Sequence, residues 1–119
     1  MSQTMPFFPR QSVVGTGVEY TSEPFDVSRF QTLNVELRVV GLIGTDPVVV
    51  ARLETAAELS SLVWSTAKTF TTITAGSVTE VEVLGPGDMS QYVRGHLSMS
   101  GGANVALTFS MIGVAREGT

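Results

Sequence analysis

Alternation of apolar and polar residues with a period of two is the feature that most constrains this chain. In QTLNVELRVVG, residues 31–41, Leu33, Val35, Leu37 and Val39 fall on one face, and the polar residues between them fall on the other. This is the pattern of a half-buried β-strand. Strand-like stretches recur between glycine, proline or polar turns, at 45–55, 77–88, 91–102 and 104–116. The sequence therefore predicts an all-β domain, an antiparallel two-sheet β-sandwich.

The same alternation predicts which side chains form the core and which strands are neighbours. Gly101 and Gly102 separate the last two strands, and a glycine pair suits a hairpin, so these strands are expected to form a C-terminal β-hairpin. The stretch from Ala56 to Leu62 permits either an irregular connection or a short helical turn. The predicted core includes Leu33, Val35, Leu37, Val81, Val83, Val93, Leu97, Leu107 and Phe109.

Length, charge and cysteine usage exclude several classes of protein. A chain of 119 residues fits one domain with a core of its own. Seven basic and eleven acidic residues give a net charge of -4, so we expect neither nucleic acid nor a membrane surface as a partner. The chain has no cysteine, which removes disulfides and thiolate sites. The N-terminus lacks a secretory signal pattern, which favours synthesis and folding in a cytoplasm.

The N-terminal segment, residues 1–15, differs in composition from the remainder, residues 16–119, which we expect to form the β-sandwich domain. Phe7 and Phe8 stand between Pro6 and Pro9, so the segment favours an extended form. Two alternatives follow: the rings fold back onto their own domain, or they dock on a neighbouring protein. The preferred prediction is an extended arm that binds a partner through Phe7, Phe8 and Arg10.

The candidate catalytic side chains lack the partners that catalysis requires. Alternation places His96, the single histidine, on the polar side of its strand beside Tyr92 and Arg94, and no Gly-x-Ser-x-Gly motif offers a serine nucleophile. Glu80 and Glu82 are expected to be solvated, outward-facing glutamates. We therefore predict no catalytic residue, no cofactor and no metal site, and not an enzyme.

Other side chains of interest are aspartates and aromatic residues. Asp26, Asp46 and Asp88 lie in turn-like stretches and lack the spacing of a calcium loop, so they are expected to form turns. A sugar ring could stack on one of three aromatic side chains, Trp64, Tyr20 and Tyr92. We expect Trp64, however, to be partly buried in the core. Glycan binding remains an alternative without a supporting motif.

Between Phe25 and Arg116 the chain contains, in order, FDVSRFQTLNVELRV, VVVARLET, Trp64 with Phe70, QYVRGHLSMSGG and LTFSMIGVAR. In this succession the chain resembles small β-sandwich proteins of tailed bacteriophages. The succession of a strand, a tryptophan, YVR and a closing strand is also similar to galactose-binding jelly rolls. This chain departs from their pattern before the tryptophan, where TAAELSSLV replaces a Ser-Asn-Asp-Gly turn, so the sugar or calcium site of such modules is not carried over.

The resemblance implies a jelly-roll-like fold and a structural role in the virion. The expected protein is a capsid decoration or cement protein, synthesised in the host bacterial cytoplasm. It would bind itself, as a homotrimer, and the major capsid protein or another virion protein. The alternative is a carbohydrate-binding module for host attachment, placed on a tail or head fibre.

Overall fold

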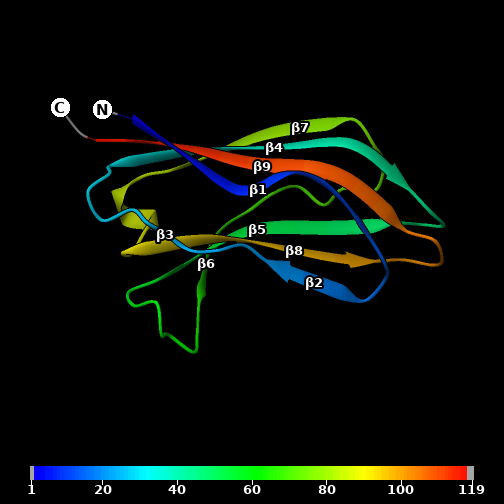
Figure 1. Cartoon of the computed structure of the whole chain (residues 1–119), viewed down its shortest axis with the longest axis horizontal. Helices are drawn as coiled ribbons and strands as arrows, with labels where there is room; N and C mark the ends of the chain where they lie inside the picture. Colours follow the sequence, from blue (N-terminus) through cyan, green and yellow to red (C-terminus); the bar gives the residue numbers. More distant parts are fainter. Residues whose placement is uncertain (1, 118–119) are drawn as a thin grey trace.

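The structure, a computed structural model that describes residues 2–117, is a sandwich of two antiparallel sheets (Figure 1). Sheet A has the strand order β1-β9-β4-β7, and sheet B has the order β2-β8-β5-β6, with β3 also paired to β8. The elements in the described residues are β1 (Ser2–Val14), β2 (Val18–Thr21), β3 (Phe25–Asp26), β4 (Thr32–Ile43), β5 (Val48–Ala56), β6 (Ser65–Thr69), β7 (Val78–Leu84), the 3₁₀ helix η1 (Pro86–Asp88), β8 (Tyr92–Ser100) and β9 (Ala106–Arg116). The predicted fold class is confirmed.

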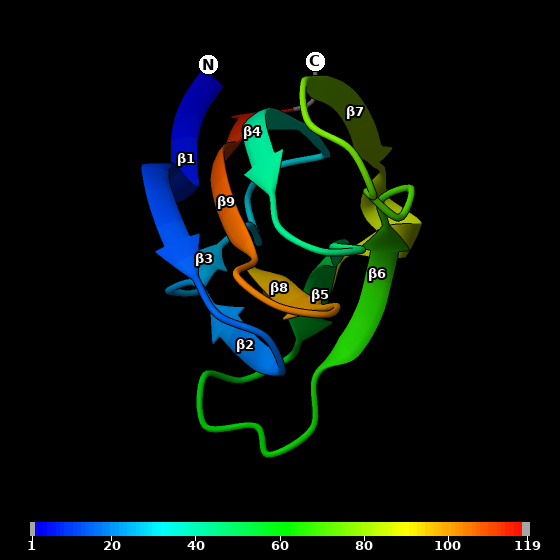
Figure 2. The ribbon, with the colours of Figure 1, turned by 90° about the vertical axis from the view of Figure 1, so that its right-hand side faces the viewer.

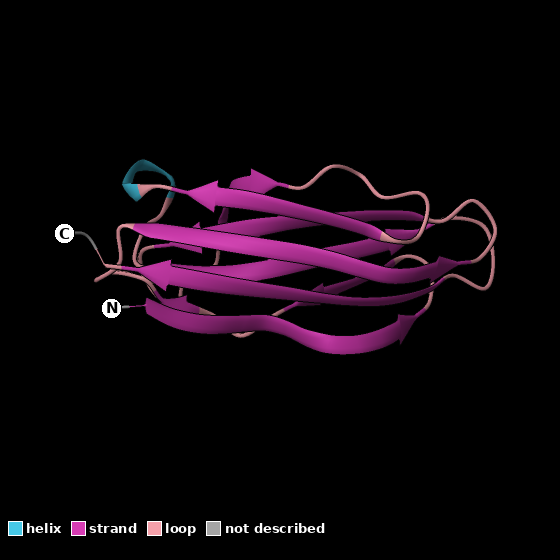
Figure 3. Ribbon diagram, turned by 90° about the horizontal axis from the view of Figure 1, so that it is seen from above, coloured by secondary structure: helices cyan, strands magenta, loops and turns pink. Residues whose placement is uncertain are grey.

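The core lies between the two sheets, whose strands run along the long axis of the molecule (Figure 3). Because successive side chains of a strand point to opposite faces, alternate residues of β4, β5, β8 and β9 enter this core. The predicted core positions Leu33, Val35, Leu37, Val93, Leu97, Leu107 and Phe109 are all buried, with at most 1% of each residue exposed.

The N-terminal segment is a strand of sheet A, which corrects the prediction of a separate arm over residues 1–15. Strand β1 pairs antiparallel with β9, from Ser2 opposite Arg116 to Val14 opposite Ala106. Phe7 and Phe8 are only 4% and 6% exposed, within the domain's own core. The fold-back alternative therefore describes both rings, and neither is free to anchor a partner.

Two consecutive inward side chains require a break in the alternation of β1. The register with β9 shifts between Pro6 and Phe8, which is a β-bulge that lets both rings enter the core. Pro6 and Pro9 are tolerated because β1 is an edge strand, where a missing N–H donor costs no ladder hydrogen bond. Glycine makes room beneath the rings, since a Cβ at Gly113 would lie 2.8 Å from Phe7 Cε2.

Strand β7 lies at the opposite edge of sheet A and faces the other way from the prediction. Val81 and Val83 are 53% and 52% exposed, so their placement in the core was wrong. The reason is register: Glu80 pairs with the inward Leu37, and Val81 pairs with the outward Glu36. Directly opposite residues in an antiparallel pair share a face, so Glu80 and Glu82 turn inward, and Val81 and Val83 turn outward.

The last two strands do not form the predicted hairpin, because β8 belongs to sheet B and β9 to sheet A. Gly101 and Gly102 form part of an arch between the sheets, and this arch packs on the β4–β5 connection. The Gly102 N–H donates to Thr45 O at 2.8 Å. A Cβ at Gly101 would lie 2.6 Å from Asp46 O, and Gly101 has a φ of 137°, so a residue without a side chain is required.

The connection between β5 and β6, residues 57–64, projects away from sheet A (Figure 2). It contains turns and bends and no helix, so the alternative of a helical turn at Ala56–Leu62 is not observed. None of the helical segments among residues 2–117 has the length and apolar character needed to cross a membrane.

Candidate functional site

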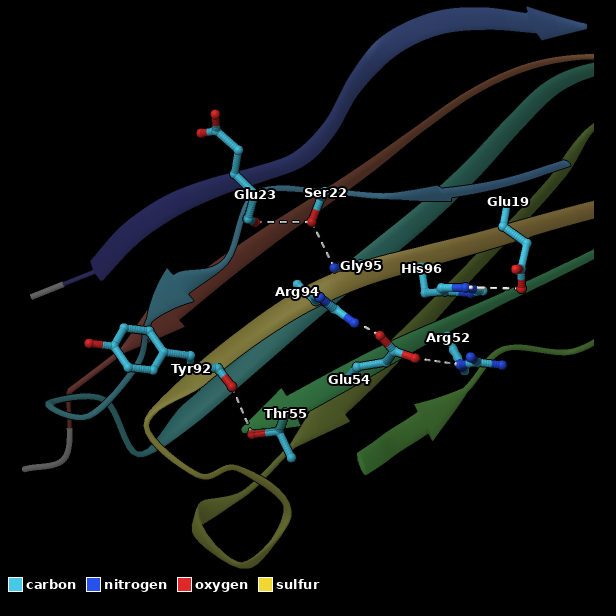
Figure 4. A network of polar contacts seen from close by, with 10 residues as sticks. All are labelled: Glu19, Ser22, Glu23, Arg52, Glu54, Thr55, Tyr92, Arg94, Gly95 and His96. Atoms are coloured by element: carbon cyan, nitrogen blue, oxygen red, sulfur yellow. Dashed lines mark hydrogen bonds and ion pairs between the residues drawn. The ribbon is translucent and has the colours of Figure 1, made fainter. Parts of the chain in front are cut away.

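The outer face of sheet B carries a group of charged side chains that lie unusually deep for a sheet surface (Figure 4). They come from alternate positions of two paired central strands: Arg52 and Glu54 on β5, Arg94 and His96 on β8. The register places Arg52 opposite His96 and Glu54 opposite Arg94, so the four form a two-by-two array. We call these four residues, with Trp64, the sheet B cluster.

Glu54 is the centre of the sheet B cluster. Its side chain is 5% exposed, and each carboxylate oxygen accepts a hydrogen bond from an arginine Nε at 2.9 Å, Oε1 from Arg94 and Oε2 from Arg52. Burial acts to raise the pKa of Glu54, but the hydrogen bonds from Arg94 and Arg52 outweigh it, so its pKa lies below the ordinary value. Glu54 therefore stays ionised and holds the two guanidinium groups in fixed positions.

Trp64 lies on this outer face, and its expected place in the core is corrected. The guanidinium carbon of Arg94 lies 4.2 Å from the centroid of the Trp64 ring, which is a cation–π arrangement. Trp64 is half-buried by this contact, at the point where the 57–64 connection enters β6. The stack joins the base of the projecting connection to the sheet B cluster. Of the other two predicted platforms, Tyr92 is half-buried on this strand, whereas Tyr20 packs against the core.

His96 lies on the polar side of β8, as the alternation predicts, but it is only 7% exposed rather than solvated. Its Nε2 lies 3.4 Å from Oε1 of Glu19, on the neighbouring strand β2. Its Nδ1 is buried and has no hydrogen-bond partner within residues 2–117. No serine, threonine or tyrosine hydroxyl in this part of the chain hydrogen-bonds to the imidazole, so the pair required to activate a nucleophile is not formed.

The other acidic residues considered in the sequence analysis fall into two groups. Asp26 and Asp88 behave as predicted, because Asp26 Oδ1 accepts from the Ser28 N–H and hydroxyl, and Asp88 Oδ2 accepts from the Gly85 N–H. Asp46, at a φ of 46°, lies in the turn before β5. No group of three potential metal ligands occurs among the residues that the structure describes.

Glu80 and Glu82 form the second group, and the prediction that both are solvated is corrected. Each is half-buried on the inward side of β7, and the Glu80 carboxylate accepts from the Thr71 N–H at 3.1 and 3.2 Å. A hydrogen bond with Glu80, together with burial, raises the pKa of Glu82 above its ordinary value.

Sequence reasoning missed Arg52, Glu54 and the stacking of Arg94 on Trp64. A signal was present, because Arg52 and Glu54 alternate on the polar side of one strand, as Arg94 and His96 do on another. Their convergence depends on the β5–β8 register, which local alternation does not specify. Of the predicted partner-binding residues, Phe7 and Phe8 lie in the core, and Arg10 is exposed on β1. A binding role for Arg10 stays a prediction.

No protein-family model and no curated protein sequence matches the chain. Solved structures share its fold. The VP2 subviral particle of infectious bursal disease virus matches with a TM-score of 0.64 at 12% identity, over 99% of this chain and 33% of that one. A protein of Bacillus endospore appendages, described as disulfide-linked pili, matches with a TM-score of 0.54 at 10% identity, over 99% of this chain and 88% of that one.

A further match is the CBM36-1 domain of a multidomain xylanase from the hindgut metagenome of Trinervitermes trinervoides. Its TM-score is 0.50 at 10% identity, and the match covers 100% of both chains. At such low identity these likenesses establish the fold alone. The chain spans about a third of the viral capsid chains that it matches. Its fold is thus a β-sandwich shared by capsid proteins and by a carbohydrate-binding module.

Proposed function

We propose that this chain is a non-enzymatic structural protein of a virion, a decoration protein that binds the head shell of a tailed bacteriophage as a symmetric homotrimer. In this proposal it is made in the cytoplasm of the bacterial host and then joins the particle. The shared fold of viral capsid proteins supports the proposal, as does the resemblance to small phage β-sandwich proteins.

The observation that carries the proposal is the absence of charge along the outer side of strand β9, at the centre of sheet A. Along the central strand β9, the outward positions from residue 106 to 114 carry no charge: Ala106, Thr108, Ser110, Ile112 and Val114. Depletion of charge is typical of the centre of a protein–protein interface. An uncharged strip of this kind suits contact with other proteins.

Exposed apolar side chains at one end of this face extend the argument. Val14 and Ile43 are 69% and 66% exposed, and both lie opposite Ala106, on the two strands that flank β9. Apolar side chains gathered in this way mark interaction surfaces. We assign this end of sheet A to the contact with the shell.

The sheet B cluster supports the non-enzymatic part of the proposal. A general acid needs a proton to donate, and the Glu54 carboxylate is ionised with both oxygens occupied by arginines. This arrangement fixes the positions of the two arginines, which is a structural or binding role.

A glycan-binding module of a tail or head fibre is the second candidate function. The observation that favours it is the presence of Trp64 and Tyr92, both half-buried, on the same outer face as Arg52 and Arg94. Aromatic faces and arginine donors together suit a sugar ring. The structural match to a carbohydrate-binding module covers the whole chain.

Electron microscopy of the source particles, labelled with an antibody against this chain, tests both candidates. The decoration proposal predicts label in a regular array over the head shell, lost from particles made without the chain. Label confined to a tail or fibre tip, with glycan binding abolished by Trp64→Ala, would replace it with the glycan-binding function. Particles that carry no label would contradict both.

A further inference from the structure

The free edge of β7 differs from the other three edges of the two described sheets. Strand β1 carries Pro6 and Pro9, which lack the N–H that a further strand would need. On sheet B, β2 and β3 have four and two residues, and β6 has five and pairs irregularly with β5. Short, bulged or proline-containing edge strands resist the addition of another strand. These three edges are therefore protected by their own backbone.

Strand β7 has no such protection in its backbone. It has seven residues and no proline, and it pairs with β4 in unbroken register, from Val78 opposite Val39 to Leu84 opposite Leu33. No further strand within residues 2–117 pairs with its other side. The backbone N–H and C=O groups on that side therefore form a regular template for another strand.

Exposed apolar side chains accompany this template on the outer face of sheet A. Val81 and Val83 are 53% and 52% exposed. A strand added beside β7 would cover part of these side chains, because cross-strand neighbours on one face of a sheet contact each other. Both the backbone and the outward side chains of β7 thus favour the addition of a strand.

The inward side chains of β7 have the opposite effect. Glu80 and Glu82 are half-buried at the border of the sandwich, opposite Leu37 and Val35 of β4. A strand added beside β7 would move this border outward and take both carboxylates further from water. Burial of ionised carboxylates without cationic partners is costly. Inward-pointing charges are one of the devices that keep an edge strand unpaired.

The groups packed around the two glutamates do not neutralise both of them. Strands β6 and β7 lie on the same side of the sandwich (Figure 2), and Lys68 of β6 is the cation whose charge acts on Glu82. The Thr71 N–H donates to the Glu80 carboxylate but carries no net charge. One lysine thus faces two carboxylates. The pKa of Glu82 is raised, first by its hydrogen bond with Glu80 and then by burial, so the second negative charge is already held at a cost.

We propose that Glu80 and Glu82 guard the free edge of β7: their negative charges keep the chain from pairing edge to edge with a second copy, and their protonation permits that pairing. Antiparallel pairing of two β7 strands about Val81 is self-complementary. It places Val81 opposite its counterpart, and Glu80 of one copy opposite Glu82 of the other. Four ionised carboxylates would then meet on the inward side, whereas protonated carboxyl groups can hydrogen-bond to one another there. This role is independent of the decoration function.

Sedimentation velocity of the full chain at pH 7 tests the guard. The double variant Glu80→Gln with Glu82→Gln removes both charges and keeps the side-chain size, so it should self-associate at least tenfold more tightly than the wild type. The double variant Glu23→Gln with Glu58→Gln removes the same charge at two exposed positions and should behave as the wild type does. A glutamine variant of β7 that associates no more than the wild type, or no more than this control, would overturn the proposal.

The wild-type chain at pH 4 provides a test without any change to the glutamates. Both carboxyl groups are then largely protonated, so the chain should associate more tightly than at pH 7, with a fold that circular dichroism shows to be unchanged. Val81→Lys changes an exposed position and places two lysines opposite each other in the paired edge, so it should abolish the association at pH 4. Association at pH 4 that Val81→Lys leaves intact would overturn the proposal.

Cysteine cross-linking locates the contact. The chain has no cysteine, so Val81→Cys supplies a single thiol. Combined with the two glutamine substitutions at pH 7, it should give an intermolecular disulfide under mild oxidation, because directly opposite residues bring their Cβ atoms close together. Thr79→Cys is exposed on the same strand but would lie opposite Val83 of the other copy, so it should cross-link far less. Equal cross-linking at the two positions would overturn the paired edge.

Discussion

The two edge strands of sheet A, β1 and β7, show opposite relations between the regularity of the sequence pattern and the burial of side chains. Strand β1 is interrupted by prolines, yet it places Met5, Phe7 and Phe8 in the core. Strand β7 alternates regularly, yet it exposes Val81 and Val83 and buries only Leu84. The irregular strand therefore supplies three large buried side chains to the core, and the regular strand supplies one.

The difference follows from what the inward side chains of each strand meet. The ring of Phe7 packs on Phe25 of sheet B, with centroids 5.2 Å apart, and the ring of Phe8 packs on Phe109 of the neighbouring strand β9, with centroids 5.3 Å apart. The inward side of β7 instead carries Glu80 and Glu82, near the edge where β6 and the following segment approach. An edge strand forms the hydrogen-bond ladder with its one neighbouring strand, and its inward face can still remain polar.

Deletion of residues 1–12 should have the largest effect, because it removes most of β1 and three buried side chains. We expect the chain to lose its cooperative fold, measured by circular dichroism and by thermal unfolding. Arg10→Ala changes an exposed residue of the same strand and should leave the unfolding midpoint nearly unchanged. A truncated chain that melts like the full chain would show that β1 is a dispensable arm.

Phe8→Ala tests the same strand without removing it. Truncation of a buried phenylalanine typically costs about 3–5 kcal/mol, because a cavity remains where the ring lay. Urea titration should therefore show a loss of about this size in the free energy of unfolding. Gly95 supports this expected loss, because a Cβ at Gly95 would lie 2.9 Å from Phe8 Cε2, which shows that the ring packs closely on the backbone of β8. A loss under about 1 kcal/mol would place the ring outside the core.

The buried face of each central strand could be predicted from sequence, because the strands on both sides place their apolar residues on that same face. Leu33, Leu37, Leu97 and Phe109 each lie within a strand that is paired on two sides, and all are buried as predicted. In such a strand, pairing on both sides places the apolar residues on the same face of the sheet as the apolar residues of the two neighbouring strands.

The edge strands and the arches could not be predicted in the same way. Whether Val81 faces in or out depends on its pairing with Glu36 rather than on its own neighbours in sequence. The Gly101–Gly102 pair permits either a hairpin or an arch, and its packing against Thr45 and Asp46 decides between them. The sheet B cluster could not be predicted from the sequence for the same reason, since it forms only through the register between β5 and β8.

Glu82→Gln examines the polar inward side of β7. The raised pKa of Glu82 means that the folded state binds this proton more tightly than the unfolded state does. Glu82 therefore contributes stability at low pH, which is lost as the pH rises above the ordinary value of 4.5. The substitution removes the repulsion from Glu80, so we expect the variant to gain under about 1 kcal/mol relative to the wild type at pH 7.

At pH 4 the same comparison should show a smaller gain or none, because the wild-type carboxyl is then largely protonated. Urea titrations of both proteins at the two pH values measure this difference. Glu58→Gln makes the same chemical change in the exposed 57–64 connection, serves as the control, and should leave the free energy of unfolding nearly unchanged. An equal gain at both pH values would indicate that Glu80 and Glu82 do not interact.

Val81→Thr should have the smallest effect of all, and it separates the two faces of sheet A most directly. Threonine keeps the β-branched shape and adds a hydroxyl, which water satisfies at an exposed site, so the free energy of unfolding should change by less than about 0.5 kcal/mol.

The matched substitution Val35→Thr, on β4 opposite Glu82, buries the same hydroxyl in the core at a position that is 0% exposed. Burial of an unpaired hydroxyl costs about 1–3 kcal/mol. Urea titration of both variants therefore measures orientation rather than chemistry, since the two changes are chemically identical. Equal losses at the two positions would mean that Val81 faces the core.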